Sequence, residues 1–353
     1  MKEQTWTNKI SNASQLGGIE TAVLDNGPGR GTRIAWINTG GGLRYKVVID
    51  RAMDIAEASY NQHNLSWISH LGTASPQPFS DKGADWLRTF GGGLLATCGL
   101  SHVGPPEEDA SGARGLHGLI SNQPAEVESI IQPDFRQGNM EMSITGTIKE
   151  TRLFGPSFEL RRTISGTVGS PSLRIHDEVV NVANTPSPHM LLYHCNFGWP
   201  LVDEGTDIIF NGSWESAGRE EDNKIFQEGN NFRKVPAPID AHLGGGEAVA
   251  FIDPTPVAGR CSCGLYNEKL GIALALHFNK QQLPCLTNWQ HWGRGEYMTG
   301  LEPGTHPPVG QTRARAENQL IILQPGEKRM YDLEIQILAS KNSISEFLKK
   351  NKS

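Results

Sequence analysis

The sequence lacks the features that mark several large classes of protein. No window approaches the roughly 18 consecutive apolar residues that a membrane helix needs, and residues 1–18 contain no apolar core typical of a signal peptide. The chain has no blocks of lysine and arginine, and its net charge is −6. A mildly acidic chain of this kind argues against nucleic acid or an anionic membrane as the main partner.

Cysteine is also scarce, and its spacing argues against a disulfide framework and against a metal site. The five cysteines are an odd number without the spacing of a disulfide framework: Cys98, Cys195, Cys261, Cys263 and Cys285. We therefore expect reduced thiols and a cytoplasmic protein. The Cys261-x-Cys263 pair has no second pair, and HxH, HExxH and CxxC are absent. We predict no metal site.

Common cofactor and nucleophile motifs are missing as well. Glycine is abundant, but none of its clusters has the GxGxxG or GxxxxGK[ST] spacing of a phosphate-binding loop. No GxSxG nucleophile elbow occurs. We therefore expect no bound cofactor and assign the glycine clusters to turns.

Helical patterns are few, whereas strand patterns are frequent. In "YDLEIQIL", Tyr331, Leu333, Ile335 and Ile337 alternate with polar residues, and "MEMSITGTIK" alternates in the same way. With 40 glycines and 21 prolines marking turns, the pattern predicts an all-β protein built as a large antiparallel β-sandwich. Further strands are predicted in "TRIAWIN", "LRYKVVI", "AEVESII", "FELRRTISG", "SLRIHDEVVNV", "HMLLYHCNF", "EAVAFID" and "GIALALHF".

No linker or internal repeat divides the chain, so we expect one domain over residues 1–353. Residues 61–113 are the least regular stretch, and long loops of this kind often cover a binding site. The segment "SISEFLKKNKS", residues 343–353, predicts a short C-terminal helix.

Three short stretches combine the residue types that a sugar-binding site uses. They are "LHG" with His117, "YHCNFG" with His194 and Asn196, and "GLEPGTHPP" with Glu302, just after Trp289 and His291. A single histidine is more often structural than catalytic, and Glu302 alone is consistent with a turn at Pro303 and Gly304. Together, however, aromatic faces can stack on a pyranose ring, amides and carboxylates can bind hydroxyls, and histidine and glutamate can exchange protons.

The order of these stretches resembles the galactose mutarotase (aldose 1-epimerase) superfamily. The sequence is especially similar to a bacterial branch with an RGMDI-like stretch, here "RAMDIA" beginning at Arg51. The resemblance implies a β-supersandwich fold and cofactor-independent interconversion of sugar anomers. It implies that Glu302 is the base at the anomeric hydroxyl, that His194 protonates the ring oxygen, and that His117 assists.

The sequence departs from the better-known members in its substrate contacts. No arginine directly follows His117, and Arg51 with Asp54 either replaces the missing contacts or forms a structural ion pair. We predict Arg51, Asp54, Asn196, Trp289 and His291 as substrate-binding residues. The predicted partner is a sugar or sugar derivative, neither nucleic acid nor a membrane.

Two other functions fit the same residues. One is a carbohydrate-binding or sensing protein without turnover. The other is an epimerase or isomerase acting at another carbon of the sugar, which the same acid and base could support.

Overall fold

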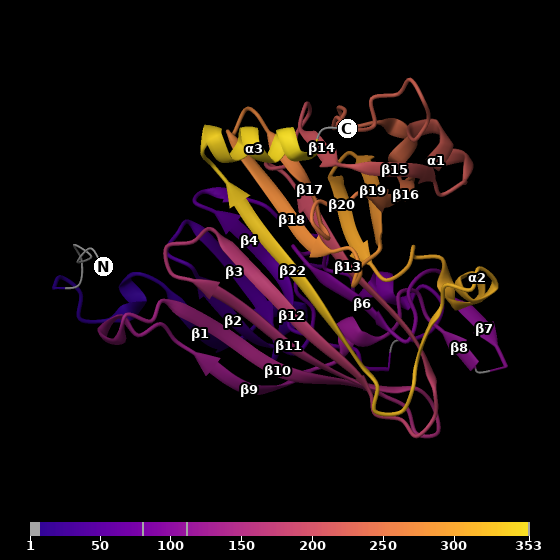
Figure 1. Ribbon diagram of the computed structural model, residues 1–353, viewed down its shortest axis with the longest axis horizontal. Coiled ribbons are helices and arrows are strands. Elements are labelled where there is room, and N and C mark those ends of the chain that lie inside the picture. The colour runs from indigo at the N-terminus through magenta and orange to yellow at the C-terminus, as the bar shows by residue number, and fades with distance from the viewer. Residues whose placement is uncertain (1–7, 80, 111, 352–353) are drawn as a thin grey trace.

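The computed structural model describes residues 8–79, 81–110 and 112–351, and strands dominate these residues (Figure 1). The α-helices of the described residues are α1 (Glu220–Ile225), α2 (Gly310–Ala316) and α3 (Lys341–Asn351). None of the helices in this part of the chain is long and apolar enough to cross a membrane.

The largest sheet is antiparallel and eight-stranded, ordered β14-β17-β18-β22-β12-β11-β10-β9. Figure 1 shows β22, β12, β11, β10 and β9 side by side, with α3 packed at the end of the sheet near β14, β17 and β18. The strand bounds are β9 (Ala125–Ile131), β10 (Glu141–Thr151), β11 (Ser157–Thr167), β12 (Ser172–Asn181), β14 (Asp207–Phe210), β17 (Arg260–Asn267), β18 (Ile272–Asn279) and β22 (Lys328–Leu338).

Two further antiparallel sheets form the facing layer. The five-stranded sheet consists of β1 (Gly18–Val23), β2 (Arg33–Asn38), β3 (Leu43–Val48), β4 (Asp54–Tyr60) and β5 (His63–Asn64). The seven-stranded sheet is ordered β15-β16-β19-β20-β13-β21, and β6 also pairs with β13. Its strands are β6 (Ala96–Leu100), β13 (Ser187–Gly198), β15 (Gly212–Ser216), β16 (Ala248–Pro254), β19 (Cys285–Gly293), β20 (Glu296–Gly304) and β21 (Ile321–Leu323). A separate hairpin pairs β7 (Glu107–Asp109) with β8 (Gly112–Arg114).

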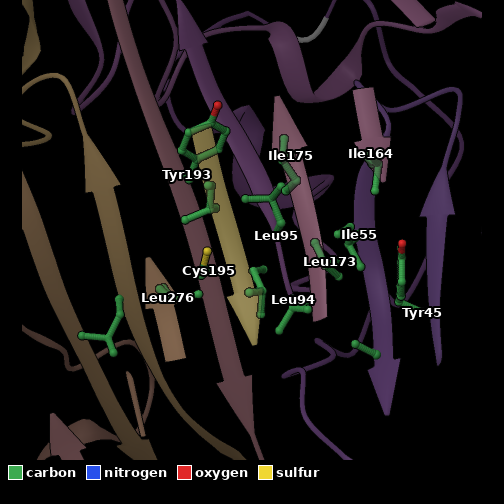
Figure 2. Packing of buried hydrophobic residues seen from close by; sticks show 14 of the residues in the cluster. Tyr45, Ile55, Leu94, Leu95, Ile164, Leu173, Ile175, Tyr193, Cys195 and Leu276 are labelled. Atoms are coloured by element: carbon green, nitrogen blue, oxygen red, sulfur yellow. The ribbon is translucent and has the colours of Figure 1, made fainter. Parts of the chain in front are cut away.

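One large apolar cluster fills the space between the layers and draws residues from all three larger sheets. Figure 2 shows Leu173 and Ile175 of the eight-stranded sheet near Tyr45 and Ile55 of the five-stranded sheet, with Tyr193 of the seven-stranded sheet in the same group. Because side chains alternate along a strand, Tyr193 and Cys195 on the core face direct His194 to the outer face of its sheet.

Buried charges also join the three sheets. Arg162 on β11 is fully buried and donates hydrogen bonds to Asp177 of β12 at 2.9 and 2.6 Å and to Asp54 of β4 at 3.1 Å. Tyr193 of β13 donates to Asp177 at 2.7 Å, and Thr97 of β6 donates to Asp54 at 2.6 Å. These contacts give the buried carboxylates the partners that they require in an apolar interior.

The predicted all-β fold is confirmed, and the alternating strands lie where the sequence indicates. Tyr331, Leu333, Ile335 and Ile337 are all buried on β22. The C-terminal helix begins at Lys341, two residues before the predicted start. Its predicted last residues, 352–353, lie outside the described residues, as do residues 1–7 of the segment in which no signal peptide is expected.

One local prediction is wrong. Pro303 and Gly304 do not form a turn beside Glu302, because both belong to strand β20. Proline lacks an N–H donor but can adopt the extended backbone of a strand. Glu302 is therefore held by pairing with β13 on one side and β19 on the other, rather than by a rigid turn.

Candidate active site

The two principal candidates, Glu302 and His194, are neighbours across a pair of strands. The antiparallel register of β13 and β20 pairs Leu192 with Gly304 and Cys195 with Leu301, which sets His194 opposite Glu302. Directly opposite residues project from the same face of a sheet. The His194 Nε2 and Glu302 Oε1 atoms are 3.3 Å apart, and the two side chains are only 7% and 3% exposed.

A glycine makes room for the Glu302 carboxylate. Gly300 lies two residues before Glu302, so the two residues share the outer face of the sheet. A methyl group on Gly300 would overlap Glu302 Oε1. The carboxylate therefore lies over the Gly300 backbone, and the cross-strand partner of Gly300 is Trp289.

Aromatic rings from the loop-rich stretch cover Glu302 and His194. We call Trp67, Trp86 and Phe90 the aromatic cover. The His194 ring centroid lies 5.9 Å from Trp86 and 5.2 Å from Phe90, and Trp86 and Phe90 stack at 4.2 Å. The covering loops and the sheet thus enclose Glu302 and His194 in a largely apolar setting.

The second predicted histidine, His117, completes the group. Its ring meets that of His194 at a centroid distance of 5.8 Å and an angle of 90°, and it lies 4.9 Å from Trp86. His117 has a φ of +58°, an uncommon conformation for a residue other than glycine. Backbone strain of this kind is concentrated at functional sites, where surrounding contacts hold it.

Burial shifts the pKa values of the three groups in the directions that favour their neutral forms. Burial raises the pKa of Glu302 well above its usual range, and the nearby charge of Glu247 raises it further. Burial lowers the pKa of His194 to about 4 and that of His117 well below its usual value. Burial thus disfavours the charged forms of both Glu302 and His194 in the ligand-free site.

Several buried polar atoms of the site have no hydrogen bond within the described part of the chain. They include His117 Nδ1, His194 Nδ1, Asn196 Oδ1 and Glu302 Oε1. Most buried polar groups in proteins are hydrogen-bonded. Atoms left free around one carboxylate and one imidazole are available to the hydroxyl groups of a ligand.

Two predicted substrate contacts, Asn196 and Trp289, lie beside the pair. Asn196 donates to the Gly93 and His194 carbonyl oxygens, which leaves its Oδ1 free. The half-buried Trp289 ring lies 5.4 Å from His194, and its Nε1 donates to Glu247 Oε2 at 2.7 Å. A ring fixed in this way can stack on the apolar face of a sugar.

The other three predicted contacts are held by partners other than Glu302 and His194. His291 shares the outer face with Trp289, two residues further along β19. Arg51 donates to the Ser121 and Thr89 carbonyl oxygens, while Asp54 pairs with Arg162 and Thr97. Arg51 and Asp54 thus have separate partners. They line a cavity of about 40 Å³ that also touches Trp86 and Phe90, so their role as direct substrate contacts stays a prediction.

Sequence reasoning missed the aromatic cover and Glu247. The cover residues are scattered through irregular segments without a recurring pattern, although aromatic residues in a long loop are themselves a signal. Glu247 follows "GGG" directly before β16 and faces Trp289 only because β16 pairs with β19. Its contact with Trp289 is a tertiary feature that no local pattern shows.

Among the described residues, no group of three or more histidine, cysteine or carboxylate side chains is arranged to hold a metal ion. All five cysteines are free thiols. His189, which shares β13 with His194, lies on the opposite face and contacts the Leu100 carbonyl oxygen and the Tyr331 hydroxyl group. The candidate acid–base group is Glu302, His194 and His117, which the ring contacts and the 3.3 Å separation bring together.

Comparison with solved structures shows the fold. A protein from Klebsiella pneumoniae subsp. pneumoniae described as "a putative aldose 1-epimerase" is 24% identical, with a TM-score of 0.82 over 94% of this chain and 86% of that one. A galactose mutarotase-like protein from Clostridium acetobutylicum is 12% identical, with a TM-score of 0.62 over 92% of this chain and 100% of the other. Galactose 1-epimerase from Lactobacillus acidophilus is 13% identical, with a TM-score of 0.59 over 91% and 98%.

Comparison of the sequence with family models gives one broad match. Among proteins with curated descriptions, none matches. Residues 29–337 match the family described as "Domain of unknown function (DUF4432)". The chain therefore belongs to the DUF4432 family, and it has the galactose mutarotase-like fold.

Proposed function

We propose that this protein is a cofactor-independent aldose 1-epimerase that interconverts the anomers of a free sugar. The observation that carries the proposal is the close pair of Glu302 and His194, 3.3 Å apart beneath aromatic rings. The fold shared with proteins described as aldose 1-epimerases and mutarotases supports it.

The proposed reaction needs one proton removed and one supplied. The Glu302 carboxylate takes the proton from the anomeric O1, the C1–O5 bond breaks with its electron pair going to O5, and His194 in its protonated form protonates O5. The resulting aldehyde turns about the C1–C2 bond. It then closes again with the proton transfers reversed, which restores both groups.

In the proposed cycle, Glu302 and His194 share one proton. A pair that holds one proton always has one acceptor and one donor, whichever anomer binds. Sugar hydroxyl groups that donate to Glu302 favour its ionised form and place the proton on His194. His117 is proposed to bind hydroxyl groups beside the reacting carbon through its free Nδ1.

The remaining contacts supply binding and orientation. Trp289 offers a ring face, and Asn196 and Glu247 offer acceptor oxygens for sugar hydroxyl groups. We also propose that the protein acts in a reducing compartment such as the cytoplasm, because its five thiols are unpaired.

The test is NMR exchange between α and β anomers across a sugar panel, with wild type compared with Glu302→Gln. Removing the proton acceptor should lower the exchange rate by about 10²-fold or more. Glu159→Gln, on the strand surface of β11, is the matched control and should retain full activity. The proposal is contradicted if Glu302→Gln keeps the wild-type rate of anomer exchange, or if the wild type accelerates the anomer exchange of no sugar in the panel.

Two further measurements, calorimetry and deuterium incorporation, separate the two other functions from an aldose 1-epimerase. A binding protein would show sugar affinity in calorimetry without faster anomer exchange. An isomerase acting at another carbon would incorporate solvent deuterium at a carbon-bound position, whereas ring opening and closing exchanges only hydroxyl protons.

A further inference from the structure

A second polar group lies on the same sheet face as Glu302. Thr287, Trp289 and His291 alternate along β19, and their cross-strand partners on β20 are Glu302, Gly300 and Met298. All of them project from the outer face, because paired residues share a face. At about 3.4 Å per residue, the His291 position lies roughly 14 Å along the strand from that of Glu302. This is longer than one pyranose ring.

His291 has an unused hydrogen-bonding atom at this distal position. Its Nδ1 contacts the Gly246 carbonyl oxygen and therefore carries the ring proton. The Nε2 atom is then an acceptor, and it is buried without a hydrogen-bond partner within the described part of the chain. His291 as a whole is only 5% exposed. A buried acceptor without a partner is costly unless a ligand supplies a donor.

Two further polar groups surround this acceptor. Glu296 on β20 has one carboxylate oxygen 3.7 Å from His291 Nε2 and the other 3.6 Å from His70 Nε2. His70 comes from the covering loops and is mostly exposed, as its side chain is 81% accessible. His291, Glu296 and His70, which we call the distal group, thus join the sheet to the covering loops where the site approaches solvent.

We propose that the distal group binds a second sugar residue, so that the substrate is a neutral reducing disaccharide rather than a free hexose. The inference rests on the proposed function, because the reducing end must occupy Glu302 and His194. Trp289, which contacts His194 on one side and precedes His291 on the strand, lies between the two positions. Hydroxyl groups of the second residue donate to His291 Nε2 and to Glu296.

The charges around the site favour a neutral second residue over a phosphate or carboxylate. Glu247 and Glu296 place negative charge on this face. The nearby guanidinium groups already have carboxylate partners, since Arg219 pairs with Asp222 and Glu247 and Arg294 pairs with Asp240. A phosphate group would meet carboxylates instead of free cations, which is unfavourable.

The experiment measures anomer exchange and calorimetric binding for glucose, maltose, melibiose and glucose 6-phosphate. Maltose and melibiose are reducing disaccharides linked through O4 and O6, so the two cover different directions of the second residue. The variants are His291→Ala, His291→Gln, which keeps an acceptor oxygen, and His176→Ala as a control histidine on the exposed face of β12. Glu302→Gln reports separately on the chemistry.

Wild type should use at least one disaccharide about tenfold more efficiently than glucose, and should use glucose 6-phosphate less efficiently than glucose. His291→Ala should raise KM for that disaccharide about tenfold with little change in kcat, and this loss should be clearly larger than the loss for glucose. His291→Gln should recover part of the loss, and His176→Ala should have no effect.

Different experimental results would overturn the distal subsite and the epimerase proposal. Equal use of glucose and both disaccharides, or equal losses for all sugars in His291→Ala, overturns the distal subsite and leaves the epimerase intact. If wild type accelerates no sugar, the epimerase proposal fails. Calorimetry then tests the subsite. Disaccharide binding that His291→Ala weakens supports the subsite, and a lack of disaccharide binding overturns it.

Discussion

At the scale of single residues, the Glu302 carboxylate depends on the absence of a side chain at Gly300. Gly300 does not have a positive φ, so its backbone conformation tolerates alanine. The space above Gly300 cannot accommodate alanine, because an added methyl group would overlap Glu302 Oε1. The separation of 3.3 Å between Glu302 and His194 thus depends on this glycine.

We predict that Gly300→Ala lowers the rate of anomer exchange by about 10²-fold, because small displacements of catalytic groups have effects of this size. The control is Gly166→Ala on β11, where an added methyl group would make an ordinary contact of 3.5 Å with the Ser172 carbonyl oxygen. NMR exchange rates, together with thermal unfolding to verify folding, provide the measurement. Normal exchange in a folded Gly300→Ala variant contradicts this role.

At the scale of elements, Arg162 joins strands of all three larger sheets. It pairs with Asp177 and Asp54, while Tyr193 and Thr97 complete the hydrogen bonds of the carboxylates. Tyr193 directly precedes His194, and Thr97 directly follows Ala96, the cross-strand partner of His194. The network therefore supports the two strands that hold His194 from the core side.

We predict that Arg162→Met destabilises the protein by about 3–5 kcal/mol, because it leaves two buried carboxylates without their cation. The matched control is Arg161→Met, whose side chain is half exposed and pairs with Glu128 on the surface; it should cost at most about 1 kcal/mol. Urea unfolding measures both values. Similar stabilities for the two variants would show that the network contributes little.

The success of sequence-based strand prediction differed between elements for a physical reason. Strands such as β10 and β22 have one face in the core and one in solvent, so their residues alternate visibly. Strands β19 and β20 are buried on both faces, because the covering loops shield the outer one. Asn288 and Gln290 then occupy core-side positions as buried polar residues, and alternation disappears.

The candidate site was predictable where it depends on local motifs and not where it depends on strand register or distant partners. Glu302, His194 and His117 could be proposed from three short motifs and a family resemblance, and the structure brings them together. The exact pairing of His194 with Glu302 depends on the register between β13 and β20, which no local pattern encodes. The partners of Arg51 and Asp54 depend on residues as distant as Ser121 and Arg162.

At the scale of the whole molecule, buried histidines make folding sensitive to acid. Burial lowers the pKa of His189 to about 3 and that of His194 to about 4, from the ordinary value of 6.5. The unfolded chain therefore binds more protons than the folded one between these values. The stabilising effect of keeping the histidines neutral is complete above pH 6.5 and is lost as the pH falls toward 4 and 3.

We predict that the free energy of unfolding falls between pH 6.5 and pH 4, with each of these histidines contributing up to about 1.4 kcal/mol per pH unit. His189 lies on the core face, away from Glu302 and His194, and His189→Gln should reduce the slope, whatever its effect on stability at pH 7. Urea unfolding at a series of pH values measures the slopes, and equal slopes in wild type and His189→Gln contradict the assignment.

The pairing of β13 with β20 also has a consequence for biosynthesis. His194 leaves the ribosome long before Glu302, since 108 positions separate them along the chain. At translation rates of about 5–20 residues per second, the imidazole waits several seconds for its carboxylate. A nascent polypeptide that ends before β20 therefore lacks the carboxylate that faces His194, so anomer exchange during translation would report that β20 has joined β13.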